Sequence, residues 1–151
     1  MGSIVAVCAS QRRMDPKRDI GEGYLREGHG LEGDAHAGLS EREISLLALE
    51  SIARANSEYG IKAGPGDFAE NLTTQGIDLL ALPLGTRLRA GEAVLEVVQI
   101  GKSPHLAHTY SFQGLSLLPT EGIFCRVVKS GWVRRGDEIV VIERRQERRP
   151  L

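Results

Sequence analysis

Short β-rich runs of mainly apolar residues recur along the chain between glycine turns, which is typical of β-strands. Residues 3–9 read Ser-Ile-Val-Ala-Val-Cys-Ala and predict a buried strand. Residues 123–129 predict another, because apolar and polar side chains alternate there. Residues 88–97 and 133–142 each read strand, Gly-acid turn, strand, and predict two hairpins.

One stretch, residues 39–58, has a helical spacing of apolar positions instead. Ser40 and Glu43 have the form of a capping box at its start, and Gly60 follows its end. We therefore expect a helix that begins a few residues after a glycine-rich stretch at 28–38. The N-terminus of such a helix would offer free N–H groups and a positive dipole end to an anion.

The predicted elements are six to eight short strands, one good helix and several glycine turns. This pattern favours a mainly β fold, a β-barrel or rolled mixed β domain, with one prominent helix and short helical pieces. We expect a single domain over residues 1–143, followed by a flexible Arg-rich tail at 144–151. The chain contains no Gly-x-Gly-x-x-Gly or Walker-type loop, so a nucleotide-binding α/β fold has no support.

Composition narrows the function classes. The 151 residues carry a net charge of −1, which gives no electrostatic footprint for nucleic acid or an anionic membrane. No apolar run approaches the ~20 residues of a membrane span. The start of the chain lacks the basic region of a signal peptide, and two cysteines fit a reducing compartment, so we expect a cytoplasmic protein.

The Gly28–Gly38 stretch holds four glycines, two histidines and two carboxylates. A polar loop with this much glycine is a usual place for binding groups, and equally a long surface turn. Together with the cations Arg42, Lys102 and Arg126 it would suit a phosphate or oxyanion. His36 could donate to such an anion, or it could be a structural histidine bonded to a backbone carbonyl.

Cys125 is the candidate nucleophile, because the neighbouring Arg126 would lower the pKa of its thiol. A thiolate could carry a persulfide; the alternative is a buried core cysteine. Cys8, inside the first predicted strand, is expected to be a small inert hydrophobe. The histidines lack zinc-site spacing, so we expect no metal site built from protein ligands alone; they are His29, His36, His105 and His108.

Five ordered blocks, at residues 30–38, 42–52, 66–72, 100–102 and 121–127, resemble a stand-alone MOSC domain, named after the C-terminal domain of molybdenum cofactor sulfurase. The resemblance covers nearly the whole chain and is closest to the small bacterial subgroup found beside molybdopterin-biosynthesis functions. It implies a β-barrel like that of the pyruvate kinase β-barrel domain. It also implies binding of molybdenum cofactor, a pterin that carries a dithiolene and a phosphate.

The resemblance also implies a set of site residues. Asp34, His36, Glu70 and Asn71 fall in matching blocks and would line the cofactor cleft. The full expected cofactor-binding set is Gly33, Asp34, His36, Arg42, Glu70, Asn71, Lys102, His105 and Arg126. Related members carry Lys-x-Cys where this chain reads Lys102-Ser103-Pro104, so that cysteine is absent here. Cys125 is then the remaining thiol for sulfur carriage.

The function implied is molybdenum cofactor binding, with sulfur transfer or carriage during cofactor maturation or delivery. One alternative is a cofactor-dependent reductase component acting on N-hydroxylated compounds. Another is a non-catalytic adaptor of cofactor biosynthesis, with the basic cluster Arg12–Arg18 and the Arg-rich tail as its contacts. Larger relatives add a pyridoxal-phosphate cysteine desulfurase, for which 151 residues leave no room. We therefore expect no pyridoxal phosphate in this chain, and a cysteine desulfurase, a molybdoenzyme or a cofactor-biosynthesis protein as its partner.

Overall fold

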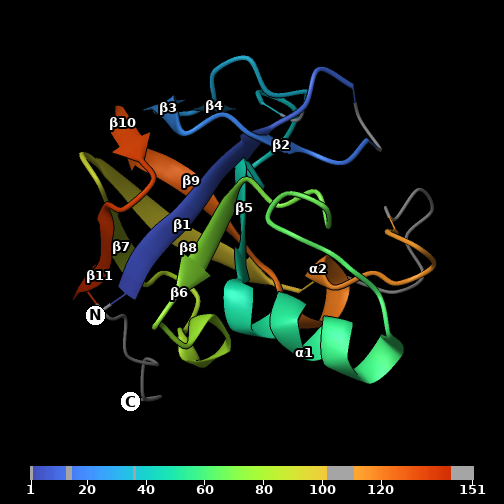
Figure 1. The fold of residues 1–151 in the computed structure, drawn as a ribbon. Helices are drawn as coiled ribbons and strands as arrows, with labels where there is room; N and C mark the ends of the chain where they lie inside the picture. The colour runs from blue at the N-terminus through green and yellow to red at the C-terminus, as the bar shows by residue number, and fades with distance from the viewer. Residues whose placement is uncertain (1, 13–14, 36, 102–110, 144–151) are drawn as a thin grey trace.

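The computed structural model describes residues 2–12, 15–35, 37–101 and 111–143, and in these residues seven strands close into a barrel (Figure 1). Each strand pairs with the next around the ring, and β11 closes it by pairing with both β7 and β1. Only β5 and β6 run parallel. The ring order is β11 (Glu138–Glu143), β7 (Arg87–Ala90), β8 (Ala93–Ile100), β9 (Ile123–Lys129), β5 (Ile44–Ala48), β6 (Leu72–Gln75) and β1 (Gly2–Ala9). The predicted barrel is confirmed.

Alternating side chains of the strands point into the barrel and form its core. A buried Leu or Ile side chain contributes about 1.5–3 kcal/mol relative to exposure, so these positions supply most of the driving force for closure. They include Ile4, Leu46, Leu72, Leu88, Leu95, Val127 and Ile139. A second cluster lies outside the barrel wall, where Ile52 and Ala55 of α1 (Leu49–Tyr59) pack against Leu47, Phe68 and Phe124.

A small second sheet closes one end of the barrel, the upper end in Figure 1. It has the order β10 (Gly131–Arg134), β3 (Glu22–Arg26), β4 (Gly30–Leu31). Leu25, Leu31 and Val133 extend from it into the barrel core. The short strand β2 (Arg18–Asp19) pairs with the end of β1, and η1 (Leu79–Ala81) and α2 (Leu118–Glu121) are short helical turns.

The predicted helix at 39–58 is wrong in its first half. Residues Ile44–Ala48 are strand β5, and α1 begins at Leu49 after Ala48, which makes no side-chain cap. The predicted capping box does not form: the Ser40 hydroxyl accepts the N–H of Arg42 at 3.1 Å, and the Glu43 carboxylate accepts the N–H of Val127 at 2.8 Å. Because β5 is buried on both faces, its apolar run reads like a buried helix.

This correction removes the predicted anion site at a helix N-terminus. β5 runs between the residue 37–43 segment and α1, which lies at the lower side of the barrel in Figure 1. The helix dipole acts only over its first turn. It therefore does not reach the glycine-rich stretch. That stretch is also not a single loop, because Gly30–Leu31 form β4 and Leu31 is fully buried.

Of the two predicted hairpins, only the first forms. β7 and β8 pair across a turn at Gly91, as expected. In the second, β10 pairs with β3 while β11 pairs with β7 and β1. The turn between them is pinned to the barrel by a hydrogen bond from the Gly136 N–H to the Ile4 carbonyl at 2.8 Å. The chain therefore passes from the small sheet to the barrel at this turn.

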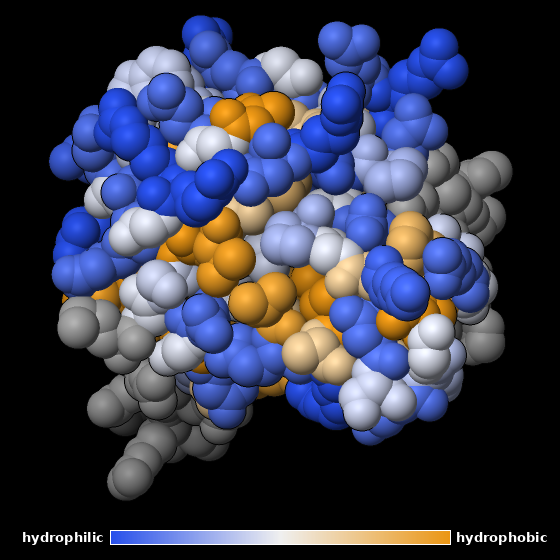
Figure 2. All heavy atoms as spheres, viewed as in Figure 1, coloured by the Kyte–Doolittle hydropathy of each residue, from blue (hydrophilic) through white to orange (hydrophobic). Residues whose placement is uncertain are grey.

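The surface has an apolar area on one face and a hollow at one end of the barrel. Figure 2 shows mainly hydrophilic side chains over the upper loops and apolar side chains over the middle of the same face. At the end of the barrel opposite the small sheet, the segment after β6, η1 and β11 line a hollow of about 410 Å³. Its lining includes Ile77, Asp78, Leu82, Ile139 and Val141.

Candidate functional site

A buried ion pair joins the segment after β1 to the turn after β4. The Lys17 Nζ atom lies 2.7 Å from Asp34 Oδ1, and each side chain is 1% exposed. The N–H of Ser10 donates to the same carboxylate oxygen at 3.0 Å, and the Lys17 ammonium also donates to the Ser10 hydroxyl at 3.2 Å. Two segments distant in sequence are thereby held at the upper end of β1.

The ion pair keeps the Asp34 carboxylate charged although it is buried. Burial raises the pKa of this group, but the Lys17 ammonium, the Ser10 N–H and the Asn71 amide more than offset that effect, so the pKa of Asp34 is lowered. A carboxylate with this many internal partners serves the structure of the turn. Asp34 therefore holds the turn after β4 against Ser10 and Lys17.

Asn71 connects β1, β5 and the chain that enters β6. Its side-chain oxygen accepts the Ser45 N–H at 3.0 Å and the Ser45 hydroxyl at 3.2 Å, and its amide nitrogen donates to the Cys8 carbonyl at 3.2 Å. The Cys8 N–H donates in turn to the Asn71 carbonyl at 2.6 Å. Asn71 is 2% exposed, so its amide fixes the strand ends on which the loops are mounted.

Glu70 is fully buried next to this junction. Its Oε2 atom accepts the N–H of Gly66 at 2.9 Å and the hydroxyl of Thr73 at 2.6 Å, whereas its Oε1 atom has no hydrogen-bond partner in the described part of the chain. Burial raises the pKa of Glu70, and the two hydrogen bonds offset this only in part. The protonated carboxyl is therefore favoured in the folded protein relative to the unfolded chain.

Gly66 allows the turn before Glu70 to lie directly on the Lys17 backbone. Its φ of +87° lies in the left-handed region, and a Cβ there would be 2.2 Å from the Lys17 carbonyl oxygen and 3.2 Å from Cys8 Sγ. Its own carbonyl accepts the Lys17 N–H at 2.8 Å. Only glycine fits this close approach.

Two expected cations lie outside the barrel wall. Arg42 is half-buried, with its guanidinium 5.7 Å from the centre of the Phe124 ring. Arg126 projects from β9 and forms an ion pair with Glu96 at 3.1 Å, and Glu96 also pairs with Arg87 at 3.2 Å. Burial raises the pKa of Glu96, and the two arginines lower it further than burial raises it. The charge of Arg126 is thus matched on the outer face.

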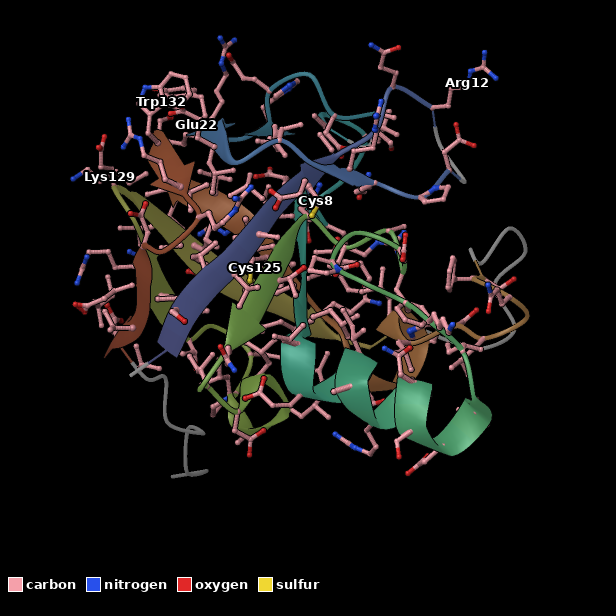
Figure 3. All side chains as sticks on the ribbon, in the orientation of Figure 1. Cys8, Arg12, Glu22, Cys125, Lys129 and Trp132 are labelled. Atoms are coloured by element: carbon pink, nitrogen blue, oxygen red, sulfur yellow. The ribbon has the colours of Figure 1, made fainter. Side chains whose placement is uncertain are left out.

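Both thiols of the chain are inside the fold. Cys125 and Cys8 are each 0% exposed, and Figure 3 shows Cys125 within the barrel and Cys8 at the upper end of β1. The expectation that Arg126 lowers the pKa of the Cys125 thiol is wrong: burial raises it, and Glu96 adds to the rise. Neighbouring residues of a strand face opposite sides, so Arg126 points away from the core that holds Cys125.

The structure brings together only part of the predicted set. Asp34, Glu70 and Asn71 meet at the upper end of β1, with Gly33 in the turn beside Asp34 at a φ of +84°. Arg42 and Arg126 are on the outer wall. His36, Lys102 and His105 lie outside the described residues. Among the residues that are described, no group of three or more His, Cys, Asp or Glu is arranged to hold a metal ion.

Sequence reasoning missed the buried role of Lys17, because the residue stands in a polar, arginine-rich stretch that is typical of a solvated loop. It also missed Ser10 and Ser45, whose contacts join segments 24 and 26 residues apart in sequence. One signal was available. Gly-Asp-Phe-Ala-Glu-Asn belongs to the block at 66–72, and two adjacent polar residues before an apolar strand must find partners if buried.

Comparison with known families decides what this barrel is. The family model described as MOSC domain matches residues 32–140. The chain belongs to the MOSC domain family. No curated protein sequence matches it significantly.

Solved structures share the MOSC fold described above. YiiM from Geobacillus stearothermophilus superposes with a TM-score of 0.73 at 22% identity, covering 95% of this chain and 76% of that one. The YuaD protein from Bacillus subtilis superposes with a TM-score of 0.72 at 21% identity, covering 92% of this chain and 94% of that one. YiiM from Escherichia coli superposes with a TM-score of 0.67 at 22% identity, covering 96% of this chain and 72% of that one. At these identities the likeness shows the fold.

The resemblance to a MOSC domain is thus confirmed, and with it an association of the family with molybdenum cofactor. The MOSC match begins at Glu32, immediately before Gly33 and Asp34. It therefore includes the turn held by Lys17 and the Glu70–Asn71 junction, while Lys17 itself precedes it.

Proposed function

We propose that this MOSC domain binds molybdenum cofactor at the upper end of the barrel, where Ser10 and Lys17 meet residues 32–35 and 64–71. The observation that carries the proposal is the buried polar network of Lys17, Asp34, Ser10 and Asn71. It fixes three loops at one end of a MOSC barrel, and a rigid scaffold that presents loops is the usual design of a binding site.

The donor set fits the anionic part of the cofactor. Arg42 lies on the outer wall with its guanidinium 5.7 Å from the centre of the Phe124 ring, and we propose it as the group that binds the phosphate. Such a group matches the geometry of a phosphate and can donate two parallel hydrogen bonds. The donor set does not fit a thiolate ligand for the metal, because both thiols are buried with raised pKa values.

The role that follows is to hold and orient the cofactor. When bound, the cofactor would supply molybdenum and dithiolene chemistry; the chain's own residues would bind its phosphate and fix the loops around it. Sulfur carriage by Cys125 stays a prediction, and it requires β9 to leave its neighbours so that the thiol can meet a donor. A partner protein completes the proposal: a cysteine desulfurase would supply sulfur, and a molybdoenzyme or a cofactor-biosynthesis protein would receive or supply the cofactor.

The partner class is a protein or a small molecule. In the described residues no helix is both long and apolar enough to cross a membrane. The net charge of −1 gives no general attraction to nucleic acid.

The test is direct binding of the phosphate-bearing pterin cofactor to the purified chain, followed by pterin fluorescence after gel filtration. We expect retention, and a weaker affinity for Arg42→Ala by about 10–100-fold, since a hydrogen bond to a charged group contributes about 1.5–3 kcal/mol. Arg89→Ala is the matched control, because Arg89 is an exposed arginine on β7. Absence of retention by the unmodified chain would overturn the proposal and favour an adaptor role.

A further inference from the structure

Lys17 is buried, unlike the described residues next to it in the sequence. In the polar stretch from Gln11 to Ile20 the other described residues are exposed, whereas Lys17 is 3% exposed. A lysine is almost never fully buried unless it is paired. Its burial therefore calls for a specific reason at this position.

The backbone explains how the residue is enclosed. The Lys17 N–H donates to the Gly66 carbonyl at 2.8 Å, and the missing Cβ of Gly66 lets the 64–67 turn cover the Lys17 carbonyl. With its main chain fixed, the side chain enters the protein, and its ammonium reaches Asp34 at 2.7 Å and the Ser10 hydroxyl at 3.2 Å.

The ammonium thereby ties down the turn beside Gly33. Asp34 also receives the Ser10 N–H at 3.0 Å, and the N–H of Ala35 donates back to the Ser10 carbonyl at 2.9 Å. Gly33 itself has a φ of +84° and open space where a Cβ would be. The start of the turn is held by the Glu32 N–H, which donates to the Tyr24 carbonyl at 3.0 Å, and its end is held over the end of β1 by Asp34 and Ala35.

A buried ion pair is a poor choice for stability alone, since apolar side chains of similar size are often equally or more stabilising. What a buried pair with directional hydrogen bonds does provide is one fixed geometry. We propose that Lys17 is a positioning residue of the cofactor site: its ammonium holds Asp34, and through it the turn 32–35, in the arrangement that receives the cofactor. This inference rests on the proposed function.

The test compares Lys17→Met with Arg18→Met, which changes the adjacent, exposed cation. Amide hydrogen exchange is measured without cofactor, and cofactor affinity by pterin fluorescence. For Lys17→Met we expect about tenfold or greater acceleration of exchange in the peptide containing residues 31–35, with little change in β8 and β9. We also expect about tenfold or greater loss of affinity. Arg18→Met should change neither.

If Lys17→Met does not fold, the double variant Lys17→Met/Asp34→Leu replaces the pair by apolar side chains and takes its place. We expect it to fold and to bind the cofactor about tenfold or more weakly. Unchanged exchange at 31–35, or cofactor affinity equal to that of the unmodified chain, would overturn the role of Lys17. Failure of the unmodified chain to bind would instead refute the proposed function, and the exchange result would still decide whether Lys17 holds the turn.

Discussion

Asn71→Ala is the substitution whose cost the structure defines best. It removes an amide that receives the N–H and hydroxyl of Ser45 and donates to the carbonyl of Cys8, at 3.0, 3.2 and 3.2 Å. Ser45 lies near the start of β5 and Cys8 near the end of β1, so the substitution separates two strand ends that support the candidate site. An alanine offers no replacement for either partner.

The magnitude follows from the groups left behind. The Ser45 N–H loses its acceptor and the Cys8 carbonyl loses its donor, both in a buried environment. An unsatisfied buried polar group costs about 1–3 kcal/mol, so the two together give a loss of about 2–6 kcal/mol. A typical domain has about 5–15 kcal/mol of stability in total. The variant should therefore be strongly destabilised, and partly unfolded at 37 °C if the starting stability is low.

Urea unfolding followed by the fluorescence of Trp132 measures this loss, with Asn56→Ala as the matched control. The Asn56 side chain also makes two hydrogen bonds, to the N–H and carbonyl of Ala63, but it is only partly buried. Water can replace its bonds, so we expect a loss of about 1 kcal/mol there. Equal losses of unfolding free energy for the two variants, or a loss below about 1 kcal/mol for Asn71→Ala, would refute the claim that the buried Asn71 amide holds the two strand ends together.

Three further predictions address the same end of the barrel. Because folding raises the pKa of Glu70 above its usual value of 4.5, the free energy of unfolding should fall as the pH rises from 4.5 through the folded-state pKa. Glu70→Gln should flatten this pH dependence in urea titrations at several pH values. An unchanged pH dependence in Glu70→Gln would contradict the assignment to Glu70. Gly66→Ala places a Cβ 2.2 Å from the Lys17 carbonyl oxygen, so its thermal midpoint should drop by about 4 °C or more, whereas an unchanged midpoint would show that the turn can move away. Cys8 and Cys125 should react with a thiol-specific reagent only on unfolding; rapid reaction in native buffer would show that a thiol opens to solvent.

The ranges of β1 and β9 could be predicted closely. β1 was recognisable by its β-rich apolar run and β9 by its composition and alternation. β5 could not be separated from a helix, since it is buried on both faces and leads directly into α1. Which strands pair with each other could not be predicted from the sequence either. The residues 133–142 have hairpin chemistry, but their two strands belong to different sheets.

The candidate site was predictable in its residues and not in their roles. The resemblance named Asp34, Glu70 and Asn71, and the structure brings them to one place. Asp34 and Asn71 belong there to a buried network, because their side chains bond to partners distant in sequence: Lys17 and Ser10 for Asp34, and Ser45 and Cys8 for Asn71. Local composition says nothing about a partner 17 or 24 residues away. Of the two interpretations of Cys125, the structure supports the buried core cysteine.

The central claim is that molybdenum cofactor binds at the upper end of this MOSC barrel. The most direct measurement is hydrogen exchange of the purified chain with and without the phosphate-bearing pterin cofactor. We predict slower exchange in peptides covering residues 31–43 and 64–71 on addition of the cofactor. Slower exchange confined to the hollow between η1 and β11, or no change at saturating cofactor, would contradict the account.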